Sequence, residues 1–197
     1  MTVHVSVLLK APRIGFVKSR LATEIGEQQA LRLYRVMAAR TLAAVKAAGL
    51  PATIWYAPAE AAPEMRRWLG DEWSLRPQAS GDLGARLAAA SRSVEAGEWW
   101  LGVGGDCPDL RASHLHQACD LLRRYRVVLG PGHDGGYYLI GGWVPLPDLF
   151  TDMPWSSDRL LMSTRARLEE LGMSHAELTV LRDVDTAADA RATGLLT

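Results

Sequence analysis

Asp106 is the residue whose setting in this sequence points most directly to chemistry. It follows the apolar residues 99–103 and the pair Gly104-Gly105, and Pro108 comes two positions later. The apolar run predicts a buried strand, which proline ends because it has no backbone N–H to donate to a sheet. Ligands of open α/β sheets bind beyond the carboxyl ends of the strands, where this turn would place the carboxylate. Asp106 is therefore a candidate ligand of a metal ion that is held against nucleotide phosphates. The alternative is an aspartate that only caps the turn before the next helix.

A second pair of carboxylates, Asp183 and Asp185, follows the last predicted strand, residues 177–181. Together with Asp106 they would form a small cluster of hard oxygen ligands. Mg²⁺ commonly takes one or two carboxylates and leaves its other positions to water and phosphate. The three aspartates therefore predict a site for Mg²⁺ or Mn²⁺. In the alternative interpretation one of the pair only caps the last helix, as Thr186 also can.

Two cations, Lys18 and Arg20, stand in a loop just after the first predicted strand, residues 3–9. An arginine grips phosphate oxygens with a bidentate fork, and a lysine binds them as a point charge. Lys and Arg are usually solvated at the surface, but a place at the same sheet edge as Asp106 favours a role in polyphosphate binding. We expect Lys18, Arg20 and Asp106 to be the catalytic residues.

Two glycine-rich stretches can bring their backbone close to a ligand. Gly81-Asp82-Leu83-Gly84 opens a predicted helix, where free amides favour anions, and with Arg86 it could touch the base or ribose of a nucleotide. His133-Asp134-Gly135-Gly136 exposes backbone amides that could hold an acceptor, and Asp-Gly between two apolar runs is also a β-hairpin signal. The residues expected to bind the nucleotide are Pro12, Gly15, Lys18, Arg20, Gly81, Asp82, Leu83, Gly84, Arg86 and Gly105. Those expected to bind the acceptor are His133, Asp134, Gly135, Gly136 and Tyr137.

Strands and helices alternate along the chain, which predicts an α/β fold with a parallel or mostly parallel sheet covered on both faces. A helix over residues 27–48 shows apolar positions at helical spacing and ends at Gly49 and Pro51. A hairpin at Asp134-Gly135 would make the sheet mixed. The predicted strands are 3–9, 52–56, 73–76, 99–103, 126–129, 137–143 and 177–181. Further helices are predicted over 63–69, 85–95 and 115–125, in the stretch that ends at 171 and in the one that ends at 193. We expect Ser113 to cap one helix, and Ser156 or Ser157 another.

The composition limits the class of protein. The chain has 197 residues, 48% of them hydrophobic, which fits a single domain over residues 1–197. Lys plus Arg and Asp plus Glu both number 22, so no overall field attracts nucleic acid or an anionic membrane. The two cysteines form no CxxC pair and suit a reducing compartment. No apolar run is long enough to span a bilayer, and we expect a cytoplasmic protein.

Taken in order, six motifs resemble one bacterial family over nearly the whole chain. It is a transferase family associated with radical-SAM and selenoprotein domains, similar to arsenosugar-type glycosyltransferases. That family belongs to the nucleotide-diphospho-sugar transferase superfamily, and it is similar to phospholactate guanylyltransferase. The motifs are Pro12-x-x-Gly15-x-x-Lys18-Ser19-Arg20-Leu21, Gly81-Asp82-Leu83-Gly84-x-Arg86, Gly105-Asp106-Cys107-Pro108-x-Leu110, Gly130-Pro131…Asp134-Gly135-Gly136-Tyr137, Trp155-Ser156 and Asp183-Val184-Asp185-Thr186.

The resemblance implies a three-layer α/β/α Rossmann-like GT-A fold with a mostly parallel mixed sheet. It also implies that Asp106 is the metal aspartate of the superfamily and that Asp183 and Asp185 match its carboxyl-terminal acidic pair. Lys18 and Arg20 match a phosphate-gripping Lys-x-Arg. Here Gly105 replaces a common serine, and His133 stands where the family usually has another residue.

Three functions follow as expectations. The first is Mg²⁺-dependent nucleotidyl transfer from a nucleoside triphosphate to a small phosphorylated or carboxylated acceptor, with release of pyrophosphate. The second is glycosyl transfer from a nucleotide sugar, with release of a nucleoside diphosphate. The third is a nucleotide-binding module without catalysis. The identity of the leaving group separates the first two.

Overall fold

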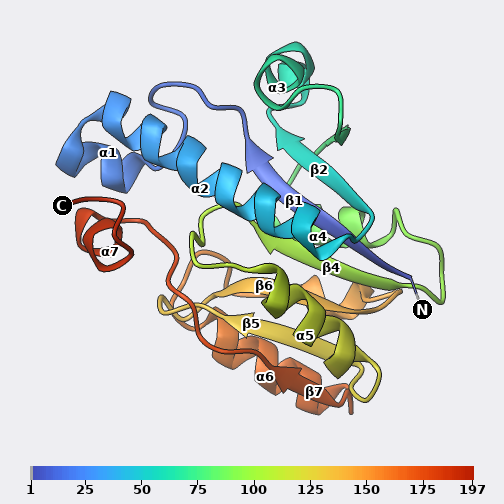
Figure 1. Cartoon of the computed structure of the whole chain (residues 1–197). Coiled ribbons are helices and arrows are strands. Elements are labelled where there is room, and N and C mark those ends of the chain that lie inside the picture. The colour runs from blue at the N-terminus through green and yellow to red at the C-terminus, as the bar shows by residue number, and fades with distance from the viewer. Residues whose placement is uncertain (1) are drawn as a thin grey trace.

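The fold is built on one seven-stranded sheet. A computed structural model describes residues 2–197, except for the side chain of Pro147. The strand order is β3-β2-β1-β4-β6-β5-β7 (Figure 1). The strands are β1 (Val3–Lys10), β2 (Ala52–Ala57), β3 (Ser74–Pro77), β4 (Trp99–Gly104), β5 (Val127–Pro131), β6 (Tyr137–Trp143) and β7 (His175–Glu177).

The sheet is mixed because one strand is reversed. β6 runs antiparallel to both of its neighbours, β4 and β5, whereas the other neighbouring pairs are parallel. The loop 132–136 joins β5 to β6, so the predicted hairpin is confirmed. Since the parallel strands all end at one edge, the loops after β1 and β4 meet there.

β1 and β4 lie at the centre of the sheet and are covered on both faces. Val5 and Val7 of β1 are fully buried. The buried hydroxyl of Ser6 accepts the indole N–H of Trp55 on one side, at 3.0 Å, and that of Trp100 on the other, at 2.9 Å. A buried hydroxyl without partners would destabilise the core, and these two donors remove that cost. The two neighbouring strands are thereby tied to β1.

Helices cover both faces of the sheet, which gives the three predicted layers. One core cluster packs α2 (Glu27–Ala48) and α5 (Ala112–Leu122) on one face, and both helices lie in front of the sheet in Figure 1. A second cluster packs α4 (Leu83–Ser91) and α6 (Leu160–Glu170) on the other face. The remaining helices are α1 (Ser19–Ile25), α3 (Ala62–Leu69), α7 (Ala187–Ala192) and the short 3₁₀ turns Ala59–Ala61 and Pro147–Phe150.

A third cluster joins the two ends of the chain. It packs α1 and the first half of α2 against Val184 and α7. Val184 is fully buried in this cluster, which fixes the segment on which Asp183 and Asp185 stand. None of the helices in residues 2–197 combines the length and the apolar character that are needed to cross a bilayer.

Several predicted boundaries are wrong. Arg111, two residues before the expected Ser113, is the N-cap of α5. Arg159 is the N-cap of α6, because residues 156–158 form a separate turn. The last strand is β7, not residues 177–181. Sequence patterns also missed α1, whose N-cap Lys18 has the left-handed backbone angle φ 50°.

Candidate functional site

A cavity of about 710 Å³ opens at the carboxyl ends of β1 and β4. Its lining includes residues that sequence reasoning selected, drawn from the loop after β1, the start of α4, the loop after β4, the β5–β6 hairpin and the C-terminal segment. Eleven such residues line it, namely Lys18, Arg20, Leu83, Arg86, Gly105, Asp106, Asp134, Gly136, Tyr137, Asp183 and Asp185. Residues far apart in the chain thus meet at one sheet edge, as predicted.

The centre of the site is an ion-pair network around Lys18. The Lys18 ammonium lies 2.9 Å from Asp106 Oδ2 and 2.8 Å from Asp185 Oδ1, and its side chain is only 8% exposed. Arg20 Nη1 adds a longer contact of 3.6 Å to the other oxygen of Asp185. Lys18 therefore lies between two of the predicted metal ligands and does not stand free in a loop.

The charges of this network shift the pKa values of Lys18 and Asp106. The Lys18 ammonium holds the pKa of Asp106 below its usual value. Burial alone would lower the pKa of Lys18, but the carboxylates of Asp106 and Asp185 raise it above its usual value. Asp106 and Lys18 are therefore both charged near neutral pH.

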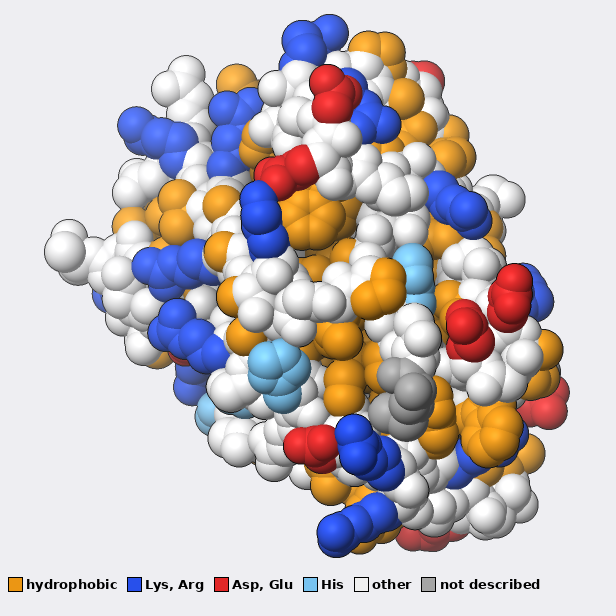
Figure 2. Space-filling model, turned by 45° about the vertical axis from the view of Figure 1, so that its right-hand side comes forward, with side chains coloured by type: hydrophobic (Ala, Val, Ile, Leu, Met, Phe, Trp, Pro, Cys, Tyr) orange, Lys and Arg blue, Asp and Glu red, His pale blue; other side chains and the backbone are white. Residues whose placement is uncertain are grey.

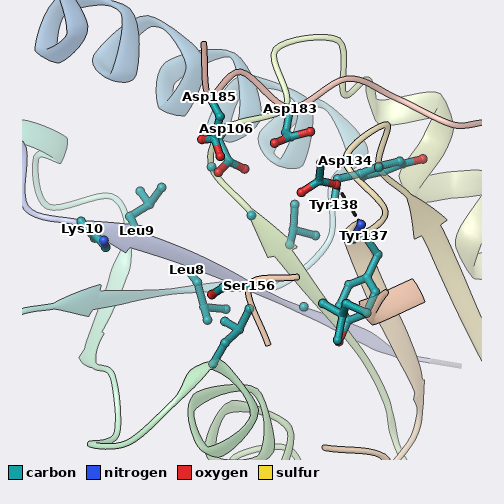
Figure 3. A pocket seen from close by; sticks show the side chains of 18 of the residues that line it. Leu8, Leu9, Lys10, Asp106, Asp134, Tyr137, Tyr138, Ser156, Asp183 and Asp185 are labelled. Atoms are coloured by element: carbon teal, nitrogen blue, oxygen red, sulfur yellow. Dashed lines mark hydrogen bonds between the residues drawn. The ribbon is translucent and has the colours of Figure 1, made fainter. Parts of the chain in front are cut away.

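The two acidic segments are joined through the backbone. The Val184 N–H donates to the Asp106 carbonyl at 3.1 Å, and the Cys107 thiol donates to the Arg182 carbonyl at 3.3 Å. With Val184 buried in the core between α1 and α7, both flanking carboxylates are left at the cavity (Figure 3). Asp189 supports the turn by accepting the backbone N–H groups of Asp185 and Thr186.

Asp183 carries the surplus negative charge of the site. Burial and the nearby carboxylates of Asp134, Asp106 and Asp185 raise the pKa of Asp183 to about 6. Lys18 offsets this effect only in part. Figure 3 shows Asp183, Asp106 and Asp134 converging from three different loops. A ligand that brings positive charge would relieve this repulsion.

The basic half of the cavity comes from the first part of the chain. Lys10 ends β1, and both its backbone N–H and its carbonyl are bonded to the Tyr34 hydroxyl at 2.8 Å. The Gln78 amide donates to the Leu9 and Trp55 carbonyls, so its oxygen is turned toward Arg86, 3.4 Å away. Positive charge and an oriented amide thus line the side of the cavity next to β1.

The other half is formed by β6, its hairpin and the turn before α6. Asp134 Oδ1 accepts the Gly136 N–H at 2.9 Å, which closes the hairpin loop. Ser156, with a left-handed φ of 62°, and Ser157 line the opposite wall. Gly135 joins the hairpin loop to the turn before α6. Its carbonyl accepts the Leu161 N–H, and its Cα lies against the Asp158 backbone.

Some of the residues expected to bind ligands lie outside the cavity lining. Asp82 caps α4 by accepting the Ala85 N–H at 2.8 Å. A Cβ on Gly84 would lie 2.5 Å from the Phe150 carbonyl oxygen, so this glycine permits helix packing. His133 is exposed and donates its backbone N–H to the Leu181 carbonyl. Pro12, Gly15, Gly81 and Gly135 likewise do not line the cavity.

Sequence reasoning missed several lining residues. Lys10 was available as the single basic residue at the end of the first predicted strand. Gln78 and Tyr34 carried no motif, and only the fold places them here. Ser157 and Asp158 follow Trp155-Ser156, and the expectation of a helix start hid their role as a turn.

The donor set fits a divalent cation with few protein ligands. The described residues contain no preformed group of three His, Cys, Asp or Glu side chains in metal-binding geometry. Asp106 and Asp183 nevertheless face the same cavity, and burial together with the nearby carboxylates raises the pKa of Asp183. Magnesium sites often use one or two carboxylates, with water and phosphate as the other ligands. The residues present are compatible with such an ion.

Comparison with known proteins gives the family. Residues 41–157, more than half of the chain, match the family described as uncharacterised protein conserved in bacteria (DUF2064), and the chain belongs to it. No curated protein matches the sequence.

Solved structures extend the comparison over nearly the whole chain. A candidate nucleotide-diphospho-sugar transferase from Desulfovibrio desulfuricans is 28% identical, with a TM-score of 0.91, over 98% of this chain and 87% of that one. A nucleotidyl transferase from Methanothermobacter is 18% identical, with a TM-score of 0.61, over 96% and 95%. Rv0371c from Mycobacterium tuberculosis, in complex with manganese, is also 18% identical, with a TM-score of 0.61, over 98% and 97%. The last two likenesses concern the fold.

Proposed function

We propose that this protein is a divalent-metal-dependent nucleotidyltransferase that releases pyrophosphate from a nucleoside triphosphate. The observation that carries the proposal is the cavity in which Lys18 pairs with Asp106 and Asp185 beside three further cations, Lys10, Arg20 and Arg86. A triphosphate needs a concentration of positive charge of this kind. The likeness to transferases of nucleotide substrates supports the same conclusion.

The basic half of the cavity would hold the triphosphate. Arg20 is 74% exposed at the side chain, so its guanidinium is free to turn from Asp185 toward phosphate oxygens. Lys10 and Arg86 add charge on the same side. These groups would offset the charge that grows on the departing pyrophosphate, which is where preorganised positive charge lowers the barrier.

Asp106 and Asp183 would hold Mg²⁺ or Mn²⁺, and Asp185 would hold Lys18 in place. The bound ion would neutralise phosphate charge and polarise the α-phosphorus. The manganese complex of Rv0371c is consistent with a divalent ion in this fold. The chain's own contribution is positioning, because a phosphoryl group attacked in line requires little covalent help.

Glycosyl transfer from a nucleotide sugar is the second candidate. It is favoured by the 28% identical relative, which is described as a candidate nucleotide-diphospho-sugar transferase. In that reaction the same cations would stabilise a departing nucleoside diphosphate. The Asp134 loop would then face the sugar or its acceptor.

A thermal-shift screen followed by product analysis tests the proposal. Nucleoside triphosphates and nucleotide sugars are compared with and without Mg²⁺ or Mn²⁺. We expect a metal-dependent shift with one triphosphate, corresponding to about 2.7 kcal/mol at a hundredfold excess over Kd. Pyrophosphate released with an acceptor supports nucleotidyl transfer. Nucleoside diphosphate released from a nucleotide sugar would replace it with the second candidate.

A further inference from the structure

The charged groups that line the cavity are separated by sign. All of its Lys and Arg residues come from β1, the start of α1 and α4, namely Lys10, Lys18, Arg20 and Arg86. The part of the lining that comes from β6, the hairpin loop 132–136 and the turn 156–158 includes Asp134 and Asp158 and, as far as the described residues show, no Lys or Arg. Asp183 adds its carboxylate beside Asp134 (Figure 3). The second half of the cavity is therefore acidic.

The two halves would treat an anionic acceptor very differently. A phosphate or carboxylate placed near Asp134 and Asp158 would meet their carboxylates with no lining Lys or Arg from the same half of the cavity, and such like-charge contacts are unfavourable. Asp134 forms no ion pair with a described residue, and one of its oxygens, Oδ1, already accepts the Gly136 N–H. Its other oxygen remains able to accept a proton donor from a ligand.

The floor between the halves is apolar. Leu8, Leu87, Ile140 and Leu160 line it together with Tyr137. A Cβ on Gly102 would lie 2.5 Å from the Trp100 ring, so a glycine at this lining position makes room for that ring. Such a surface suits the C–H face of a small carbon skeleton, and the acidic rim suits its hydroxyl groups.

We propose that the acceptor is an uncharged alcohol with several hydroxyl groups, and that Asp134 receives the proton of the attacking hydroxyl. The inference rests on the proposed function and replaces the phosphorylated or carboxylated acceptor that the sequence led us to expect. The acceptor oxygen forms a bond to the α-phosphorus. The bond from that phosphorus to the pyrophosphate oxygen breaks, and the electron pair leaves with pyrophosphate. The hydroxyl proton passes to the free oxygen of Asp134.

Matched pairs of acceptors test the charge of the substrate. Glycerol, sorbitol and inositol are each compared with their monophosphates, using the triphosphate and metal found by thermal shift. We expect kcat/KM for pyrophosphate release to be at least about tenfold higher for the uncharged member, because the carboxylates of the acidic half would repel the monophosphate. Preference for the phosphorylated members would overturn the proposal.

Binding gives a second measurement if turnover with these compounds is too slow to detect. The nucleotide-saturated protein should gain a further thermal shift from an uncharged member and none from its monophosphate. The alcohol acceptor would also be refuted if none of the uncharged compounds gave a thermal shift or turnover. Release of nucleoside diphosphate from a nucleotide sugar, in contrast, would refute nucleotidyl transfer and leave the acceptor assignment intact.

Asp134→Asn tests the proton acceptor. Asparagine can still accept the Gly136 N–H, but it cannot take a proton, so kcat should fall about 100-fold with the KM for nucleotide unchanged. Asp152→Asn is the matched control, because Asp152 is exposed, lies outside the cavity lining and has a left-handed φ of 54° that asparagine tolerates. Wild-type kcat in Asp134→Asn would exclude this role.

Discussion

The two halves of the cavity are built from different kinds of structure. In the basic half, Lys10 is fixed by Tyr34 at the end of a central strand, and Lys18 is held between two carboxylates. The acidic half stands on a hairpin loop and a turn with left-handed residues at Gly135 and Ser156. Loops on a rigid scaffold are where specificity changes at small cost to the fold. The basic half is therefore suited to a constant ligand, and the acidic half to the part of the substrate that varies.

Charge outside the cavity shows no such separation. Figure 2 shows side chains of both signs distributed over one face, with apolar side chains between them. The equal numbers of acidic and basic residues agree with that mixture. The face drawn in Figure 2 thus lacks the separation by sign that the cavity lining shows.

Lys18→Met should break the basic half most severely. It leaves Asp106 and Asp185 without their shared cation, and a lost charge at a phosphoryl-transfer site commonly costs about 10³-fold or more in kcat. The measurement is pyrophosphate release, with circular dichroism to show that the fold is kept. Lys46→Met is the control, because Lys46 pairs with Glu72 at the surface. Turnover within tenfold of wild type would remove Lys18 from the mechanism.

Gly135→Ala should disrupt the acidic half through its backbone. The added Cβ would lie 2.0 Å from the Asp158 carbonyl oxygen, at a φ of +82°. We expect the free energy of unfolding to fall by about 2–4 kcal/mol in urea denaturation, since both overlap and strain act. Gly172→Ala separates the two causes. It has a φ of +62° with nothing within 4 Å, so its loss should be about 1 kcal/mol. Equal losses in the two variants would mean that the contact with Asp158 contributes nothing.

Arg86→Ala tests whether the two halves bind different ligands, because Arg86 should contribute to the binding of nucleotide alone. The guanidinium stands beside the Gln78 oxygen at the edge of the basic half. Its removal should raise the KM for nucleotide about tenfold and leave the KM for acceptor unchanged. Arg92→Ala, an exposed arginine at the end of the same helix, is the comparison. A rise in the acceptor KM would show that the halves are not separate.

Asp183→Asn should give the smallest effect on the free energy of unfolding, seen in its dependence on pH. The pKa of Asp183 is about 6 in the folded protein, against a usual value of 3.8, so the folded state binds more protons. The contribution of this carboxyl to stability is therefore fully present below about pH 4 and is lost as the pH rises through 6. The ligand-free variant should exceed wild type by about 1 kcal/mol at pH 8, after allowance for screening, and match it at pH 4. Unfolding curves at the two pH values measure the difference, and a variant less stable than wild type at pH 8 would contradict the repulsion.

Much of the fold could be predicted because its patterns are local. The helical spacing of apolar residues with Gly49 at the end gave the bounds of α2, and apolar runs gave β1, β4 and β6 closely. The predicted N-cap of α6, Ser156 or Ser157, was wrong because tertiary contacts, and not the presence of a serine, decide where the helix begins. The start of α1 was hidden for a related reason. Its N-cap is Lys18, whose left-handed backbone is held by ion pairs to residues far along the chain.

The site could be predicted only as a meeting of residues. Topology alone brings Asp106, Asp183 and Lys18 to one sheet edge. It does not show that the ammonium lies between Asp106 and Asp185, because that arrangement depends on side-chain reach. Nor could the negative charge of the acidic half be deduced, because Ser156 and Asp158, which line it, were assigned to the start of a helix.

The salt bridge between Lys18 and Asp185 joins residues 167 positions apart. Since β7 ends at Glu177, every strand has been synthesised before Asp183 leaves the ribosome. A nascent or truncated chain that stops short of this point would contain the residues of all seven strands. Its Lys18 would lack Asp185, one of its two acidic partners. The ion-pair network around Lys18 is thus complete only after the segment that follows β7 has been synthesised.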